Sequence, residues 1–491
     1  MDLDKDLNLN PIFEPQAIAL VGASDKISSW GFIVAHNIVQ NNYTGQFFPV
    51  NPKREEILGY KSYPSILDIP KEVQLDLVII IIPAKSVLSI LEQAKQRNVH
   101  HVVIISAGFR ESGEEGRKLE EKIVAYAQQN SIRIIGPNGM GVVSTRVNLT
   151  AVMWPVTGLK QGGMAFVSQS GNIGTIGLTV ASRRGIGLNV YVSAGNMADL
   201  TMADYLEYFG RYDSQTKVIG FYVEGVQNPR RFVKLVKEIS KNKPVIILKA
   251  GGTTAGSRAA LSHTGAITGD DQVFRNILEN AGAILVDSLD EMFDLVLVFS
   301  LWAEMKFPRG KVVILTRGGG WGVMAADECS RQGINLVPLN ENAYKKIDQL
   351  LPPYWSKGNP IDTVASLNLN DVKEIIQIIF DEMPMVEAIF LLGVGGIAYL
   401  ANLAKKSPFI LDENKDQLDL ISDLEVDLFK EVIKLSRSYN KPILITTLLT
   451  AHNSPSIQFL ESQDYPIFPS PARMVQAFRY MVNYYRWRLR L

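Results

Sequence analysis

The sequence predicts an α/β protein built from parallel, doubly wound sheets, and three observations lead to this prediction. Short runs rich in valine and isoleucine alternate along the chain with segments of helical spacing, which is the pattern of consecutive βα units. In the first part of the chain the predicted strands end in glycine, proline, asparagine or serine, which favour turns. The 491 residues are 46% apolar, enough for cores in about three domains of ~150 residues.

The charge and cysteine content exclude several classes of protein. Lysine plus arginine and aspartate plus glutamate each total 50, whereas nucleic-acid or anionic-membrane partners select a basic excess. Cys329 is the single cysteine, which excludes a disulfide framework and a cysteine-rich metal site. The longest apolar run, residues 77–82, is too short to span a membrane, and the acidic N-terminus does not resemble a signal peptide. We therefore expect a cytoplasmic protein without a metal, nucleic-acid or membrane partner.

The predicted βα units fall into three blocks. In the first, residues 10–150, strands are predicted at 17–21, 47–50, 77–82, 101–106 and 133–135. A glycine- and proline-rich connection, residues 152–163, leads to a second block with strands predicted at 164–167, 190–192, 218–223, 245–248 and 283–286. After a boundary at 306–310, the third block has strands predicted at 312–315, 334–337, 388–392 and 442–446. Residues 471–491 predict a final amphipathic helix.

The second and third blocks contain an internal repeat. At a constant offset of 148 positions, residues 165–174 align without gaps with residues 313–322, and residues 182–188 align with residues 330–336. Glycine, serine and arginine positions coincide in the two copies. Two copies of one flavodoxin-like domain explain this coincidence better than the general use of glycine in βα units does.

In each copy a turn opens a helix, where free backbone N–H groups and the helix dipole favour a phosphate group. The turn of the second block consists of Ser168, Gln169, Ser170, Gly171 and Asn172, and its two serine hydroxyls are further candidate donors. The turn of the third block runs from Thr316 through Gly319 and Gly320. The alternative for either turn alone is simple capping of the helix, worth ~1 kcal/mol. Because the turns coincide in the repeat, we expect two helix starts that face one anion.

A similar turn, residues 22–26, follows the first predicted strand. It lacks the G-x-G-x-x-G pattern, so it does not indicate a nicotinamide cofactor. A charged ligand would still bind at the carboxyl ends of these strands, where Lys53 and Lys85 supply positive charge. The alternative is a plain tight turn, and the spacing alone favours neither interpretation.

His263 is the most informative histidine, because it lies in a long stretch of small residues, 251–269. Such a stretch lacks the bulky apolar residues of a core, and loops of this length are often functional. A histidine there can act as a nucleophile or general base, and the alternative is plain solvent exposure. Glu224 ends an apolar predicted strand, so its carboxylate must be paired, commonly with Arg or Lys, or with a histidine that it orients.

Taken together, these motifs make the chain similar to the α subunits of NDP-forming (ADP-forming) acyl-CoA synthetases, relatives of succinyl-CoA synthetase. The resemblance covers about residues 10–470 in the family's domain order. Its motifs are Val21-Gly-Ala-Ser24, Pro49-Val-Asn-Pro-Lys53, Ser106-Ala-Gly-Phe109, Gly136-Pro-Asn138, Ser168-Gln-Ser-Gly171, Tyr222-Val-Glu-Gly225, Lys249-Ala-Gly251 and Ser262-His-Thr-Gly265. The sequence departs from the family at Gly139, where cysteine is common, and at Trp321.

The resemblance implies three domains and a set of site residues. It implies a Rossmann-like CoA-binding domain at 1–152, flavodoxin-like, succinyl-CoA synthetase-like domains at 160–302 and 308–470, and a C-terminal helix at 471–491. His263, on a loop of the 160–302 domain, would be the phosphorylated histidine, and Glu224 the carboxylate that steadies it. Phosphate would be held by Ser168, Gln169, Ser170, Gly171, Asn172, Gly319 and Gly320. CoA would contact Gly22, Ala23, Ser24, Lys26, Asn51, Lys53, Pro83 and Ser106, and the acid would contact Asn138.

The implied reaction interconverts acyl-CoA, ADP and phosphate with a carboxylic acid, CoA and ATP, through an acyl phosphate and then a phosphohistidine. No nucleotide-binding ATP-grasp portion follows residue 470, so we expect a separate ATP-grasp β subunit in a hetero-oligomer. That subunit would carry most of the contacts to ATP or ADP and Mg²⁺. The alternative is a CoA-binding regulatory or scaffold protein without turnover. The presence of His263, Glu224 and the 168–171 motif favours the enzyme, because a mere CoA binder needs none of them.

Overall fold

The computed structural model describes residues 7–252, 271–303, 305, 309–364, 368–409, 415–449 and 454–490. The chain forms two compact units, Met1–Met292 and Phe293–Leu491. Within the described ranges, no helix is both long enough and apolar enough to cross a membrane.

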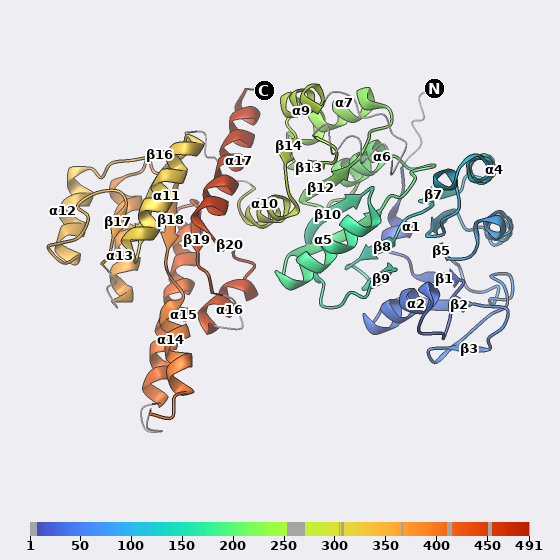
Figure 1. Ribbon diagram of the computed structural model, residues 1–491, viewed down its shortest axis with the longest axis horizontal. Coiled ribbons are helices and arrows are strands. Elements are labelled where there is room, and N and C mark those ends of the chain that lie inside the picture. The colour runs from blue at the N-terminus through green and yellow to red at the C-terminus, as the bar shows by residue number, and fades with distance from the viewer. Residues whose placement is uncertain are drawn as a thin grey trace. The chain divides into compact units, whose positions relative to one another are not determined.

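The first sheet of unit Met1–Met292 is parallel, with the strand order β2-β1-β5-β6-β7. Its strands are β1 (Ala17–Val21), β2 (Gln46–Val50), β5 (Leu77–Ile80), β6 (His101–Ile104) and β7 (Arg133–Ile135) (Figure 1). It is accompanied by α1 (Asn10–Phe13), α2 (Trp30–Gln40), α3 (Val87–Gln96), α4 (Glu114–Gln129) and the small pair β3 (Glu56–Ile57) and β4 (Tyr60–Lys61). The strand order reverses between β1 and β5, so the carboxyl ends of these two strands form the position where open α/β sheets bind ligands.

The second sheet of this unit has the order β14-β13-β12-β10-β11-β8-β9. Its strands are β8 (Gly141–Ser144), β9 (Leu149–Val152), β10 (Lys160–Ser168), β11 (Gly187–Ser193), β12 (Val218–Val223), β13 (Val245–Lys249) and β14 (Ile284–Val286). Its helices are α5 (Gly171–Arg183), α6 (Met202–Glu207), α7 (Pro229–Ile239) and α9 (Asp271–Asn280), and a π-helical turn covers Tyr208–Tyr212. Helix α10 (Leu289–Trp302) begins in this unit and continues into unit Phe293–Leu491. Strands β10 to β14 pair in parallel, so their carboxyl ends share one edge.

The hairpin β8–β9 was not expected from the sequence. It pairs antiparallel with β11 and thereby extends the second sheet. Gly141 makes the close pairing possible, because a Cβ at this position would lie 1.9 Å from Ala151 O. Among the described strands, the hairpin is therefore hydrogen-bonded to the second sheet and not to the first. The predicted domain boundary at residue 152 stays a prediction.

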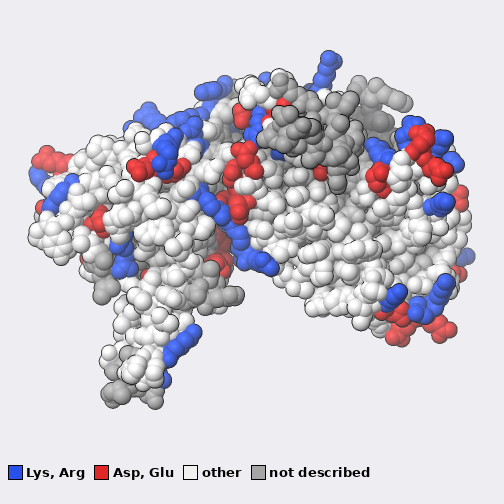
Figure 2. Space-filling view, in the orientation of Figure 1, with Lys and Arg blue, Asp and Glu red and all other residues white. Residues whose placement is uncertain are grey.

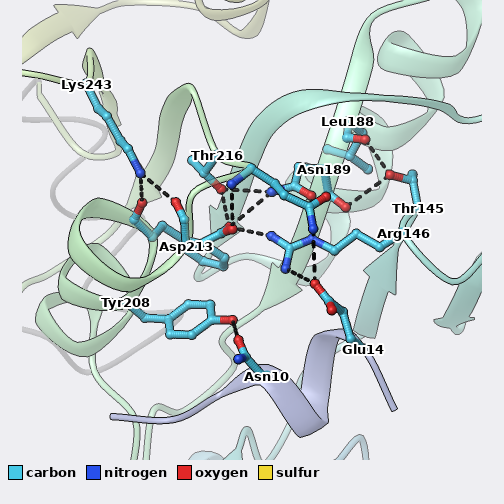
Figure 3. Close-up of polar contacts among 12 residues, drawn as sticks. Asn10, Glu14, Thr145, Arg146, Leu188, Asn189, Tyr208, Asp213, Thr216 and Lys243 are labelled. Carbon is cyan, nitrogen blue, oxygen red and sulfur yellow. Dashed lines mark hydrogen bonds and ion pairs between the residues drawn. The ribbon is translucent and has the colours of Figure 1, made fainter. Parts of the chain in front are cut away.

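A buried polar network joins the N-terminal segment to the second sheet (Figure 3). The Arg146 guanidinium, whose side chain is 5% exposed, donates to Asp213 Oδ2 at 2.5 Å and to Glu14 Oε1 at 2.6 Å. Its Nε donates to Asn189 Oδ1 at 2.7 Å, and Asn189 Nδ2 donates to Asp213 Oδ2 at 3.1 Å. A buried guanidinium is tolerated only when it is paired, so these contacts hold the end of α1, the β8–β9 connection and β11 together.

Unit Phe293–Leu491 is built on a parallel sheet with the order β16-β15-β18-β19-β20, and β17 pairs with β15. Its strands are β15 (Lys311–Thr316), β16 (Asn335–Leu336), β17 (Ile361–Asp362), β18 (Ala388–Leu392), β19 (Ile443–Thr446) and β20 (Ile467–Phe468). Its helices are α11 (Gly319–Gln332), α12 (Glu341–Leu350), α13 (Leu369–Glu382), α14 (Gly396–Lys405), α15 (Lys415–Ser438), α16 (Pro455–Ser462) and α17 (Pro471–Leu489). Helix α17 is the predicted C-terminal helix and buries Met474, Phe478 and Met481 on one face.

The structure confirms the internal repeat and the α/β fold class. Helices α5 and α11 begin at Gly171 and Gly319, which differ by the offset of 148 found in the sequence. Each helix is followed by a glycine with positive φ, Gly185 at +62° and Gly333 at +65°. Glycine adopts this conformation without the penalty that a side chain brings, so the same residue type ends the helix in both copies.

Basic and acidic side chains are intermixed on the faces of the units that Figure 2 shows, with uncharged areas between them.

Candidate active site

The predicted phosphate turn lies between β10 and α5. Ser170 is the N-cap of α5, and its Oγ accepts from Ile173 N at 3.4 Å, which leaves its hydroxyl proton available to a ligand. Ser168 is buried, and its hydroxyl donates to Ser170 O at 2.6 Å. The hydroxyl of Ser168 therefore shapes the turn, and the predicted contact of Ser168 with a phosphate stays a prediction. The N–H groups at the start of α5 and the Ser170 hydroxyl are the remaining donors.

Gln169 ties the end of β12 to this turn. Its Oε1 accepts from the backbone N–H groups of Glu224 and, at 3.0 Å, of Gly225, and its Nε2 donates to Gly225 O at 2.9 Å. Strands β10 and β12 are parallel neighbours, so Glu224 and the start of α5 lie at the same edge of the sheet. The side chain of Gln169 thus positions Glu224, and the predicted contact of Gln169 with a phosphate stays a prediction.

A lysine joins Glu224 at this edge. Lys249 ends β13 beside β12, and its ammonium lies 5.6 Å from the centre of the Phe274 ring. Burial lowers the pKa of Lys249, while the neighbouring carboxylates of Asp271 and Glu224 act in the opposite direction. Burial also raises the pKa of Tyr222, and the charge of Glu224 adds to that effect. Arg275 Nε lies 3.1 Å from Asp271 Oδ2, so among the described residues this edge gathers the cations Lys249 and Arg275 and the carboxylates Glu224 and Asp271.

Gly252 and Asp271, the described residues on the two sides of the segment that carries His263, lie at this same edge. Gly252 follows β13, and a Cβ on it would lie 3.0 Å from Asp271 Oδ2, at the start of α9. His263 itself lies outside the described residues, so its role as a phosphohistidine stays a prediction. Its partner in that prediction, Glu224, is half-buried beside the two ends of the stretch.

The predicted CoA turn lies at the carboxyl end of β1. Gly22 has a φ of +94°, and a Cβ on it would lie 2.4 Å from Ile81 O, directly after β5. Helix α2 begins at Trp30 and not directly after residues 22–26. Its start still packs against Gly22, since a Cβ on Gly31 would lie 2.0 Å from Gly22 O. The close approach of these backbones explains why glycines occupy both positions.

The residues predicted to contact CoA fall into two groups. Lys26, Lys53 and Pro83 are exposed and Ser24 is half-buried, so these side chains are accessible to a ligand. Asn51 and Ser106 instead form hydrogen bonds to the backbone around the predicted CoA turn. Asn51 Nδ2 donates to Ala23 O at 2.8 Å, Asn51 Oδ1 accepts from Lys53 N at 2.9 Å, and the buried Ser106 accepts from Ile82 N at 3.0 Å. The two exposed ammonium groups fit a ligand that carries phosphates, as CoA does.

Residues 136–140 connect the two edges within unit Met1–Met292. Asn138, whose side chain is exposed, donates its backbone N–H to Ser106 O at 2.9 Å. Met140 N donates to Ser193 Oγ at 2.8 Å, at the end of β11 and next to β10. A hydrogen-bonded path therefore runs from the carboxyl end of β6, on the side of the predicted CoA turn, to the predicted phosphate turn.

The corresponding turn of unit Phe293–Leu491 repeats the local geometry. Thr316 Oγ1 donates to Gly318 O at 2.9 Å, as Ser168 does in the other copy, and Gly319 and Gly320 at the start of α11 are exposed. These two glycines belong to a different unit from Ser170 and Gly171, so the expectation that both helix starts face one anion stays a prediction.

A second helix start in this unit is occupied by the protein's own carboxylate. Glu425, fully buried on α15, accepts from the N–H groups of Gly395 at 3.0 Å and Ala398 at 2.8 Å, at the start of α14. Ser456 Oγ donates to the same carboxylate at 3.0 Å. The positive end of α14 is therefore neutralised internally.

Comparison with known proteins places this arrangement in a family. Residues 16–145 match the model of a CoA binding domain, and residues 161–299 match that of a succinyl-CoA ligase like flavodoxin domain. The α subunit of ADP-forming acetate–CoA ligase II of Pyrococcus furiosus is 39% identical over 365 residues, 74% of this chain and 78% of that protein. The α subunit of acetate–CoA ligase I of the same organism is 34% identical over 489 residues, 98% of this chain and 99% of that protein.

The chain belongs to the family of ADP-forming acyl-CoA synthetase α subunits. Its structure resembles that of the dinucleotide forming acetyl-coenzyme A synthetase 1 of Ca. Korarchaeum cryptofilum in complex with phosphate and ADP, with a TM-score of 0.83, 28% identity and 98% of each chain covered. The expected CoA-binding and flavodoxin-like, succinyl-CoA synthetase-like fold is confirmed. Like its relatives, the chain is part of an acid–thiol ligase, and the regulatory alternative is not favoured. The relatives' designation as subunit alpha implies a partner subunit.

Sequence reasoning missed three side chains at these edges. Lys249 was noted only as part of a motif, although a lysine at a strand end directly before glycines was a visible signal. Asp271 gave no signal, because nothing in the sequence shows that it lies beside Gly252. Met140 stands between Gly139 and Gly141, and two flanking glycines were a visible signal of a closely packed backbone with a single side chain on it.

Proposed function

We propose that this chain is the CoA-binding and phosphohistidine-carrying subunit of an enzyme that interconverts acyl-CoA, ADP and phosphate with a carboxylic acid, CoA and ATP. The observation that carries the proposal is the connection within one unit of two sites, the turn at Gly22 and the start of α5, through residues 136–140. Relatives over most of the chain are named ADP-forming acetate–CoA ligases, which supports a small carboxylic acid as substrate.

In this proposal the reaction passes through two phosphorylated species. An oxygen of phosphate attacks the thioester carbonyl carbon, the C–S bond breaks, and CoA leaves as the thiolate, giving an acyl phosphate. A neutral imidazole nitrogen of His263 then attacks phosphorus, the P–O bond to the acyl group breaks, and the carboxylate leaves. Transfer of the phosphoryl group from His263 to ADP gives ATP and restores the imidazole.

The described residues supply positioning and charge for these steps. The N–H groups at the start of α5 and the Ser170 hydroxyl stabilise the negative charge of the phosphoryl group, as positioned donors do in phosphoryl transfer. Glu224, held by Gln169, would fix the tautomer of His263 by accepting its other ring N–H. Lys249, together with Arg275, whose Nε lies 3.1 Å from Asp271 Oδ2, offsets the charge of the Glu224 and Asp271 carboxylates at the same edge.

The nucleotide would be bound mainly by a partner subunit of the ATP-grasp type, together with Mg²⁺. The designation of two relatives as subunit alpha supports a hetero-oligomer of this kind. We further propose that the complex works in the cytoplasm, where CoA and ATP are available.

The experiment that tests this function compares the isolated chain with the complex purified with its native partner. The complex should form acyl-CoA from ATP, CoA and a small carboxylic acid, and the full-length chain alone should bind CoA in calorimetry without forming acyl-CoA. ATP-dependent synthesis by the isolated chain would show that the nucleotide site is not on a partner. CoA binding without synthesis by any complex would return the chain to a regulatory role.

A further inference from the structure

We propose that Met140 determines the size of the carboxylic acid that the enzyme accepts. The inference rests on the proposed function and assigns a residue that neither the motifs nor the comparisons single out. It is carried by the contact between the Met140 side chain and the helix start that would hold the phosphoryl group.

The side chain of Met140 covers the first residue of α5. A Cβ on Gly171 would lie 2.4 Å from Met140 Cγ and 3.4 Å from its Sδ. Any side chain at position 171 would therefore displace the thioether, and the glycine allows Met140 to lie directly against the helix start. Met140 is half-buried, so part of its side chain is still accessible to a ligand.

The backbone around Met140 is fixed on both sides. Its N–H donates to Ser193 Oγ at 2.8 Å, and its carbonyl accepts from Met153 N at 3.0 Å. The neighbouring residues are Gly139 and Gly141, and a Cβ on Gly139 would lie 2.7 Å from Ser193 O. Because residues 139 and 141 are glycines, Met140 is the one residue of 139–141 with a side chain other than hydrogen. Its backbone is held by hydrogen bonds on both sides.

The acyl group of the substrate must lie beside this side chain. In an acyl phosphate the acyl carbon is separated from phosphorus by a single bridging oxygen, so a phosphoryl group at the start of α5 places the acyl group within contact distance of it. The thiol of CoA must reach the same carbon from the side of β6, where Asn138 N donates to Ser106 O at 2.9 Å. Met140 lies on the segment that joins these two sides, so its thioether limits the space for the acyl chain.

The chemistry of methionine suits this role. Its unbranched, flexible thioether forms an apolar wall next to a carboxyl group that is held by polar donors. Shortening the side chain adds space for further methylene groups, and one methylene in an apolar pocket changes discrimination by about tenfold or more. The variant Met140→Ala should therefore accept longer acids, whereas Met140→Trp should exclude them.

The test uses the complete complex and a series of straight-chain acids from acetate to hexanoate. In Met140→Ala the ratio of kcat/KM for hexanoate to that for acetate should rise at least about tenfold, and in Met140→Trp it should fall. Met140→Leu, which keeps the volume, should leave the ratio within about threefold of the wild type. The KM for CoA should stay the same in all three, and Met324→Ala, an exposed methionine on α11, is the matched control.

Three outcomes would overturn the inference. The first is an unchanged ratio in Met140→Ala, and the second is an equal loss of kcat/KM for every acid. The third is complete inactivity of a Met140→Ala protein that melts like the wild type, because it would assign the thioether to holding the helix start. Failure of the wild-type complex with every acid would instead overturn the proposed function and, with it, this inference.

Discussion

At the scale of single residues, the site depends on side chains that hold other groups in place. Gln169 shows this most clearly, because its amide binds the backbone of Glu224 and Gly225 from a neighbouring strand. The sequence reveals that a polar side chain is present in a turn but does not reveal its partner. For that reason the bonds of the Ser168 hydroxyl and the Gln169 amide within the protein could not be predicted, while the contact of these residues with phosphate stays a prediction.

The first prediction at this scale concerns Gln169. In Gln169→Ala, Glu224 loses its support, so phosphoryl transfer by the complex should slow by about ten- to hundredfold, as expected for a small displacement of a reacting group. CoA binding should be unchanged, because Gln169 lies on the other side of residues 136–140. Rapid-quench kinetics and calorimetry measure the two quantities, and Gln128→Ala, an exposed glutamine on α4, is the control. Equal losses in rate and CoA affinity would indicate general disruption.

A second prediction concerns Lys53, which is exposed next to the Gly22 turn. If its ammonium contacts a phosphate of CoA, Lys53→Ala should weaken binding by about 1–3 kcal/mol, and the effect should decrease as salt is added. Calorimetry on the full-length chain measures this change. Lys118→Ala, on the surface of α4 with a 66% exposed side chain, should have no effect. If both variants bind CoA as tightly as the wild type, the phosphates of CoA do not contact Lys53.

At the scale of elements, most of the strands could be predicted because buried parallel strands are short apolar runs followed by turn residues. Residues 17–21 and 218–223 agree with β1 and β12 in full. The hairpin β8–β9 was missed, although its two strands pair locally. Its further pairing with β11, more than forty residues along the chain, could not be predicted because local sequence carries no information on it. The repeat was visible because glycines with positive φ end both helices, a local requirement.

The loop that begins α4 gives a prediction on pH. Burial would raise the pKa of Glu111, but hydrogen bonds from Asn196 Nδ2 at 2.7 Å and from Phe109 N at 3.0 Å outweigh it, and the pKa is lowered. A glutamate with a lowered folded-state pKa stabilises the protein above its unfolded-state pKa. That stability is lost as the pH falls through the folded-state pKa.

Acid unfolding of Glu111→Gln measures this contribution. The variant should be less stable than the wild type at neutral pH, and the difference should shrink as the pH falls below the usual pKa of a glutamate. Glu115→Gln, an exposed residue in the first turn of α4, serves as the control. A constant difference at all pH values would show that the charge of Glu111 is not responsible.

At the scale of the whole molecule, the sequence predicted the family and the order of the domains but not the network that joins them. Arg146 lies in an ordinary polar stretch between two strands, and its partners Glu14 and Asp213 are distant in the sequence. Only the folded chain brings the three charges together (Figure 3). This network belongs to unit Met1–Met292, in which the predicted CoA and phosphate turns are connected.

The network should contribute strongly to the stability of that unit. Asp213→Ala leaves the guanidinium of Arg146, 5% exposed, with only Glu14 as a charged partner, and should cost about 3–5 kcal/mol in urea unfolding. The surface pair Lys345–Glu341, whose side chains are 65% and 79% exposed, is the matched control, and Glu341→Ala should cost less than about 1 kcal/mol. Similar costs for the two variants would contradict the structural role of the buried network.

The central claim is that this chain carries the phosphoryl group on His263 during turnover. The measurement that tests it most directly is incubation of the complete complex with labelled phosphate and acyl-CoA, followed by separation of the subunits. We expect label on this chain that is labile to acid and stable to base, as a phosphohistidine is. We also expect its loss in His263→Ala and its slower appearance in Glu224→Gln. Label that persists in His263→Ala would place the nucleophile on another residue and contradict the account.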